Sequence, residues 1–157
     1  MTQLAIGDNA PDFSLPRDGG ETLTLDDFHG HYLILYFYPK DDTPGCTLEA
    51  IDFSARKSAV NLINGRILGV SKDTVAKHEK FTAKHDLTIP LLSDADGDLC
   101  ERYGVWVEKN MYGRKYMGIE RATYLIGPTG KILEIWRKVR AKGHVDIVYK
   151  ALKSHAE

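Results

Sequence analysis

The most continuous hydrophobic stretch of the chain covers residues 32–38, where every side chain is apolar or aromatic. A short apolar run without alternation predicts a strand buried on both faces, as in the centre of a parallel sheet. Residues 67–71 predict a second strand and residues 89–92 a short third one. Pro90 gives this third strand an entry or edge position, because proline cannot donate a ladder hydrogen bond.

Two helical patterns alternate with these strands. Residues 44–64 predict a long helix, and Asn64 with Gly65 would end it. Residues 74–85 predict a polar helix capped by Asp73 or Ser71. Apolar positions at helical spacing predict the buried stripe of the long helix, which consists of Ile51, Ala55, Ala59 and Leu62.

The other segments are shorter and complete an α/β order. Residues 7–28 predict an N-terminal β-hairpin around a turn at 18–20. Right-handed crossovers between the strands would place helices on both faces of one sheet. Later in the chain we expect a short helix at 98–103, a loop containing Gly113 and Gly118, a hairpin of 122–126 with 131–137, and a last helix at 145–154.

The composition is that of an ordinary globular protein. With 157 residues, of which 43% are hydrophobic and 27% charged, the chain suits a single domain, residues 1–157. The net charge of 21 − 22 = −1 argues against nucleic acid as a partner, since such binding needs clustered cations. No apolar run is long enough for a membrane span, and the first residues show no secretory signal. We therefore expect a cytoplasmic protein, either a monomer or a weak dimer.

The chain contains two cysteines, Cys46 and Cys100, and six histidines. Neither cysteine belongs to a C-x-x-C pair, and the histidines show no metal-ligand spacing. The sequence therefore predicts neither a metal nor another cofactor. Each cysteine is either a small buried hydrophobic residue or a reactive thiol.

The position of Cys46 favours the reactive alternative. A buried strand ends at Tyr38, a polar loop follows, and Thr43 with Pro44 forms a favourable helix start. Cys46 then lies in the first helical turn, where backbone N–H groups lack helical partners and favour an anion. A thiol held there ionises more readily than a free one. Gly45 removes a side chain that would cover the sulfur.

The pattern Pro39-x-x-x-Thr43-x-x-Cys46 resembles the active-site motif of the peroxiredoxins. The longer run over residues 37–49 is similar to the bacterioferritin comigratory protein, or peroxiredoxin Q, subfamily. Further matches follow in the same order along nearly the whole chain. They are Gly7-Asp8-x-Ala10-Pro11-Asp12-Phe13, Ser71-x-Asp73, Leu92-Ser93-Asp94 and Arg121-Ala122-Thr123-Tyr124-Leu125-Ile126.

This resemblance implies a thioredoxin-like fold, with a central mixed β-sheet flanked by helices and an N-terminal β-hairpin. It also implies a thiol-dependent peroxidase that reduces hydrogen peroxide and organic hydroperoxides. Cys46 would be the peroxidatic nucleophile and become a sulfenic acid. Thr43 would bind the peroxide and orient the thiolate, and Pro39 would shield the site from water. Arg121 would stabilise the thiolate and polarise the peroxide, while Glu49 would position Arg121.

The chain departs from the subfamily in its second cysteine. Many members carry a resolving cysteine at the position of Ile51, and others carry it within residues 81–84, where this chain has none. Cys100 is the remaining candidate, and we expect it to pack on the core. The sequence thus favours a one-cysteine mechanism with an external reductant, either thioredoxin, glutaredoxin with glutathione, or a small thiol. An internal disulfide after local unwinding remains the alternative.

Two other functions compete with the peroxidase. A thiol–disulfide oxidoreductase would use a C-x-x-C pair, and Thr43 occupies the first position of that motif. A redox sensor or a chaperone-like holdase would need Cys46 without efficient turnover.

Overall fold

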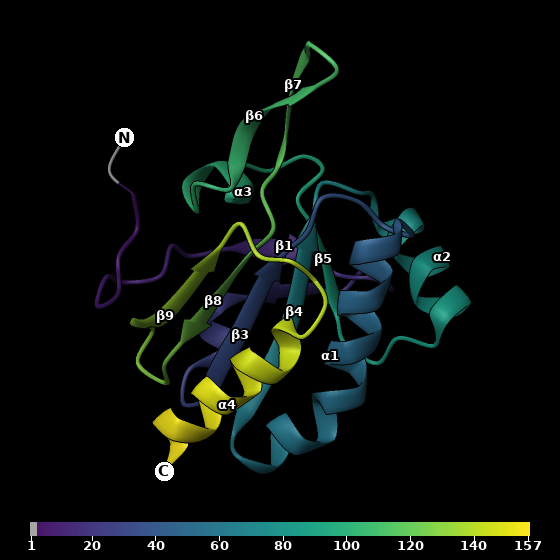
Figure 1. The fold of residues 1–157 in the computed structure, drawn as a ribbon. Coiled ribbons are helices and arrows are strands. Elements are labelled where there is room, and N and C mark those ends of the chain that lie inside the picture. Colours follow the sequence, from purple (N-terminus) through teal and green to yellow (C-terminus); the bar gives the residue numbers. More distant parts are fainter. Residues whose placement is uncertain (1–2) are drawn as a thin grey trace.

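The computed structural model describes residues 3–157, which contain a five-stranded sheet in the order β5-β4-β3-β8-β9. β3 pairs in parallel with β4, and β4 with β5, whereas β8 and β9 join antiparallel (Figure 1). The predicted mixed sheet is therefore confirmed. Its strands are β3 Tyr32–Phe37, β4 Gly65–Ser71, β5 Leu91–Ser93, β8 Ala122–Ile126 and β9 Ile132–Arg137.

β3 is the central strand and is buried on both faces, as its sequence predicts. Ile34 and Tyr36 belong to one hydrophobic cluster, and Leu35 and Phe37 belong to the other. Because successive side chains point to opposite faces, one apolar run supplies the centre of both clusters.

Three helices cover the first face of the sheet. They are α1 Pro44–Leu62, α2 Val75–His85 and α4 His144–Ala156, and all three contribute to the cluster that contains Tyr36. The prediction of which side chains α1 buries is wrong, since Ile51 is 42% exposed and Leu62 is 86% exposed. The helix instead buries Cys46, Glu49, Ala50, Phe53 and Val60. The stacked rings of Phe53 and Tyr36, with centroids 4.5 Å apart, orient this face toward the sheet.

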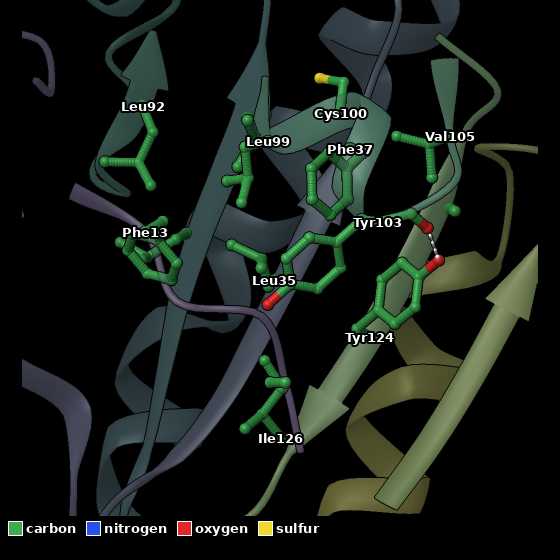
Figure 2. Packing of buried hydrophobic residues seen from close by; sticks show 14 of the residues in the cluster. Phe13, Leu35, Phe37, Leu92, Leu99, Cys100, Tyr103, Val105, Tyr124 and Ile126 are labelled. Carbon is green, nitrogen blue, oxygen red and sulfur yellow. Dashed lines mark hydrogen bonds between the residues drawn. The ribbon is translucent and has the colours of Figure 1, made fainter. Parts of the chain in front are cut away.

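The second face is covered by the N-terminal segment and by the one-turn helix α3 Leu99–Arg102. The hairpin of β1 Ser14–Pro16 with β2 Thr22–Thr24 confirms the predicted N-terminal hairpin, and a 3₁₀ turn, η1 Leu25–Phe28, follows it. In this cluster the Tyr124 hydroxyl donates to the Tyr103 carbonyl at 2.7 Å (Figure 2). Helices thus lie on both faces, as expected, although among residues 3–157 the second face carries only the one-turn helix α3 and the 3₁₀ turn η1.

The segment predicted as a loop around Gly113 and Gly118 is a hairpin instead. β6 Trp106–Met111 pairs antiparallel with β7 Arg114–Ile119 and projects from the body of the molecule (Figure 1). Tyr112 and Gly113 both have positive φ, at 53° and 80°, which is the backbone of a tight two-residue turn. Most of the residues of these two strands are exposed, and their apolar side chains do not alternate regularly with polar ones, so no strand pattern marked them in the sequence.

Two local predictions also need correction. The third strand begins at Leu91 rather than at residue 89. α2 is capped by Thr74, whose hydroxyl oxygen accepts the N–H of Lys77 at 3.2 Å, and not by Asp73 or Ser71. The Ser71 hydroxyl instead donates to Asp73 at 2.7 Å. Within residues 3–157, no helix combines the length and hydropathy needed to cross a membrane.

Gly69 in β4 allows close packing on the first face of the sheet. A Cβ atom there would lie 2.8 Å from the Tyr36 ring and 2.8 Å from Leu91. We expect Gly69→Ala to lower the free energy of unfolding by about 1–3 kcal/mol, because the buried ring has little room to move. Gly118→Ala is the control, since its Cβ meets only flexible side chains and should change stability by less than about 0.5 kcal/mol. Equal urea midpoints for the two variants would contradict this account.

Candidate active site

Cys46 is the third residue of α1 and is 1% exposed. Thr43 precedes the helix with an extended backbone, and Pro44 occupies the first helical position, as predicted. The Thr47 N–H donates to the Thr43 carbonyl at 2.8 Å and begins the helical ladder. The N–H groups of Gly45 and Cys46 precede that ladder, so their partial positive charge surrounds the thiol.

The antiparallel pairing of β3 with β8 brings Arg121 to this helix start. Phe37 pairs with Ala122, which places Arg121 beside the end of β3. Its Nη2 donates to Cys46 Sγ at 3.3 Å, and its Nη1 donates to Glu49 Oε1 at 2.6 Å. Cys46, Glu49 and Arg121, which the family resemblance linked, therefore form one contact group.

Glu49 and Arg121 form a largely buried ion pair, with side chains 0% and 15% exposed. Burial raises the pKa of Glu49 to about 7, although the charge and hydrogen bond of Arg121 oppose this shift. Burial also disfavours the charge of Arg121. The charges and hydrogen bonds of Glu49 and Cys46 outweigh this effect of burial, so the pKa of the guanidinium is raised. Arg121 is thus a permanent cation, whereas the charge of Glu49 changes near neutral pH.

Gly45 leaves space for the arginine. A Cβ atom at Gly45 would lie 3.1 Å from Arg121 Nη2. The sequence predicts that Gly45 keeps the sulfur uncovered, and in the structure the missing side chain also lets the guanidinium approach Cys46.

Thr43 and Pro39 lie in the loop between β3 and α1. Thr43 has the backbone of an N-cap, but its hydroxyl donates to the Lys40 carbonyl at 2.8 Å and does not cap the helix. The hydroxyl oxygen keeps its acceptor capacity for another hydrogen bond. Pro39 is half-buried directly after the buried end of β3.

Cys100 lies on the other face of the sheet from Cys46. It belongs to the cluster of Phe37 and Tyr103, whereas Cys46 belongs to the cluster of Tyr36. Both thiols are free and buried. Burial and the neighbouring Asp94 raise the pKa of the Cys100 thiol, and its backbone N–H donates to Asp94 at 2.9 Å. Cys100 therefore packs on the core, as its sequence predicts, and its thiol is un-ionised.

His78 is a feature of this region that sequence reasoning missed. The six histidines received no role because their spacing suggested no metal site. The structure buries His78 in α2 against Asp41 of the active-site loop, with Nδ1 and Oδ2 2.7 Å apart. The one sequence signal was its spacing of three residues from Phe81, which shares the buried face of α2.

An α/β fold with a buried arginine over a cysteine at a helix start defines a thiol enzyme of the thioredoxin-like class. Comparison with known proteins gives a family. The model of the AhpC/TSA family matches residues 6–135. Peroxiredoxin Bcp of Xanthomonas campestris is 46% identical over 100% of this chain and 99% of its own length. The putative peroxiredoxin bcp of Coxiella burnetii is 51% identical over 90% and 94% of the two chains.

Solved structures agree with these relatives. A cysteine-to-serine mutant of Xylella fastidiosa PrxQ shares 43% identity over 100% of both chains, with a TM-score of 0.94. The bacterioferritin comigratory protein of X. campestris shares 47% identity over 92% of both chains, with a TM-score of 0.88. The chain belongs to the AhpC/TSA family and is a peroxiredoxin, a thiol-dependent peroxidase. The predicted fold class and enzyme class are therefore confirmed.

The contact of Arg121 with the sulfur predicts a large effect on the reaction with peroxide. Arg121→Ala removes one fixed donor from the charge that develops in the transition state. We expect the second-order rate of enzyme oxidation by hydrogen peroxide to fall by about 10²-fold or more. Arg114→Ala, on the exposed strand β7, is the control and should react at the wild-type rate. A wild-type rate in Arg121→Ala, measured by stopped-flow fluorescence, would remove Arg121 from the site.

The pKa of Glu49 predicts a pH dependence for the same rate. Below pH 7 this carboxylate gains a proton and holds Arg121 less tightly, whereas above pH 7 the ion pair is complete. At alkaline pH we expect Glu49→Gln to react about 10-fold more slowly than wild type, since a hydrogen bond to a charged group contributes roughly 1.5–3 kcal/mol. The ratio of wild-type to variant rate should approach one as the pH is lowered through 7. If the ratio of the wild-type rate to the Glu49→Gln rate did not change with pH, the positioning of Arg121 by the Glu49 carboxylate would be contradicted.

Proposed function

We propose that Cys46 carries out peroxide reduction as the nucleophile of this peroxidase. The observation that supports it best is the 3.3 Å contact of Arg121 Nη2 with Sγ at the start of α1. The thiolate attacks one peroxide oxygen, an S–O bond forms, and the O–O bond breaks. Cys46 becomes a sulfenic acid, and the other oxygen leaves as hydroxide or alkoxide and takes up a proton.

The surrounding groups fit the charges of this step. Arg121 and the N–H groups of Gly45 and Cys46 point donors toward the developing negative charge. Glu49 positions the guanidinium through its 2.6 Å hydrogen bond. Thr43 binds the peroxide as an acceptor, because its own hydroxyl proton is donated to Lys40.

Hydrogen peroxide and organic hydroperoxides are the proposed substrates. The X. campestris bacterioferritin comigratory protein is described by its alkyl peroxide reduction activity, which supports the organic class. Pro39 is proposed to restrict water at the reacting sulfur, in keeping with its half-buried position at the end of β3.

We infer a one-cysteine mechanism, in which an external thiol reduces the sulfenic acid of Cys46. The supporting observation is that Cys46 and Cys100 belong to clusters on opposite faces of the sheet. A disulfide needs Cα atoms within about 7 Å, so pairing them would require local unfolding. Thioredoxin, glutaredoxin with glutathione, or a small thiol is the proposed reductant.

We further propose that residues 1–157 form a single domain, which acts as a monomer or weak dimer. We place it in the cytoplasm, because free thiols such as these stay reduced there.

This mechanism predicts different outcomes for the two cysteine variants. Cys46→Ser should lose peroxide consumption, because no other thiol on the sheet face of α1 can replace it. Cys100→Ser should keep both the oxidation step and turnover with glutathione plus glutaredoxin. Mass spectrometry after one equivalent of peroxide and dimedone should find one adduct, at Cys46, with Cys100 still alkylatable.

Two results would contradict the proposal. Peroxide consumption by Cys46→Ser at the wild-type rate would refute the nucleophile. A stoichiometric Cys46–Cys100 disulfide, together with loss of thioredoxin-dependent turnover in Cys100→Ser, would refute the one-cysteine mechanism. An insulin-reduction assay should show no disulfide reductase activity.

A further inference from the structure

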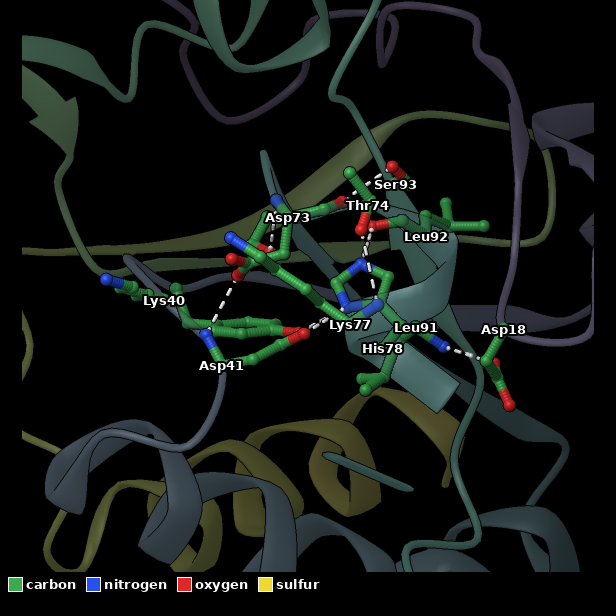
Figure 3. A network of polar contacts seen from close by, with 12 residues as sticks. Asp18, Lys40, Asp41, Asp73, Thr74, Lys77, His78, Leu91, Leu92 and Ser93 are labelled. Carbon is green, nitrogen blue, oxygen red and sulfur yellow. Dashed lines mark hydrogen bonds and ion pairs between the residues drawn. The ribbon is translucent and has the colours of Figure 1, made fainter. Parts of the chain in front are cut away.

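The loop before Cys46 is held from outside its own segment, by residues at the ends of β3 and β4 and in α2 (Figure 3). The Tyr38 hydroxyl donates to Asp41 Oδ1 at 2.6 Å, and the Asp41 N–H donates to Asp73 Oδ2 at 2.8 Å. The other carboxylate oxygen of Asp41 lies 2.7 Å from His78 Nδ1. Asp41 thus connects this loop by hydrogen bonds to Tyr38, Asp73 and His78.

The partners of His78 define its protonation. Its Nε2 lies 2.8 Å from the Leu92 carbonyl, which can only accept, so Nε2 carries a proton. Its Nδ1 faces the Asp41 carboxylate, whose other oxygen already accepts a hydrogen bond from Tyr38. When the ring is protonated, Nδ1 also donates to this carboxylate, and the buried ring is then an imidazolium held between two acceptors. Burial of the ring opposes this charge, but the hydrogen bond and charge of Asp41 outweigh it and raise the pKa of His78.

The loop transmits this contact to the reactive residues. The Thr43 hydroxyl donates to the carbonyl of Lys40, the residue before Asp41, and the helix that carries Cys46 begins directly after Thr43. We propose that His78, acting through Asp41, is a positioning residue that keeps Thr43 and Cys46 in the reactive geometry while its ring is protonated. This inference rests on the roles proposed above for Thr43 and Cys46.

The sign of the pH effect follows from the hydrogen bonds. The charged or titratable groups that face the ring are Asp41 from the loop, Asp73 from the end of β4 and Tyr38 from the end of β3. When the ring loses its proton, a lone pair on Nδ1 faces the Asp41 carboxylate and the pair is broken. The positioning is therefore complete below the ordinary histidine pKa, and it is lost as the pH rises through the raised pKa.

A second histidine–aspartate pair on the same two segments is a matched control. His85 Nε2 lies 2.9 Å from Asp42 Oδ1, so it also joins α2 to the loop, but the two side chains are 21% and 42% exposed. Water screens such a pair and can replace its hydrogen bonds, so it should contribute little to the loop geometry.

The test measures oxidation of the reduced enzyme by hydrogen peroxide across the neutral and alkaline range. His78→Asn should react about 10-fold to 10²-fold more slowly at neutral pH, since small misplacements of reacting groups cost rates of this size. His85→Asn should keep the wild-type rate and pH profile. In Asp41→Asn the new amide can donate to Nδ1 of a neutral ring, so the alkaline fall in rate that wild type shows should disappear.

Nitrogen NMR of the wild-type imidazoles supplies a measurement that needs no variant. It should show His78 protonated on both nitrogens at neutral pH, even if His78→Asn fails to fold. A neutral His78 ring at that pH would overturn the inference. So would a folded His78→Asn with the wild-type rate and profile, or an alkaline fall that persists in Asp41→Asn. If Cys46→Ser is inactive while these results are found, the inference fails and the proposed function stands, whereas an active Cys46→Ser refutes the function itself.

Discussion

The placement of one guanidinium between a buried thiol and a buried carboxylate is the constraint on which this structure depends. Arg121 contacts Cys46 and Glu49, both on the face of α1 that lies against the sheet. A buried cation is costly unless it is paired, and Glu49 supplies the pairing charge. Gly45 supplies the space, because any side chain there would displace the guanidinium. The four residues therefore form a unit in which each position limits the others.

The central strand β3 explains why the two cysteines differ so strongly. Its alternating side chains divide the core into two clusters, and each cluster encloses one thiol. Cys46 lies at a helix start, and its sulfur accepts a hydrogen bond from the Arg121 guanidinium. Cys100 lies in an apolar cluster beside the carboxylate of Asp94, and both disfavour a negatively charged sulfur. The two thiols therefore have different surroundings on the two faces of the sheet.

The active-site loop connects the reactive turn to the rest of the fold through polar contacts. Asp41 receives hydrogen bonds from the end of β3 and from α2, and its N–H reaches Asp73 after β4. Such a network makes the geometry of Thr43 and Cys46 depend on elements that contribute nothing to the chemistry. It also leaves the two carboxylates of the loop facing other partners, since Asp42 contacts Lys84 and His85.

The sequence alone determined the features that depend on neighbours along the chain. The apolar run of β3, the Thr43–Pro44 helix start that places Cys46 in the first turn, and the motif spacing predicted the scaffold, the candidate nucleophile and the family. Only the tertiary structure decided which face of α1 is buried, that β6 and β7 pair, and that His78 holds the loop. The contact of Arg121 with Cys46 spans 75 positions and arises from the register of β3 with β8. The periodicity of one segment does not identify its partner strand, because the pairing hydrogen bonds join segments that are distant along the chain.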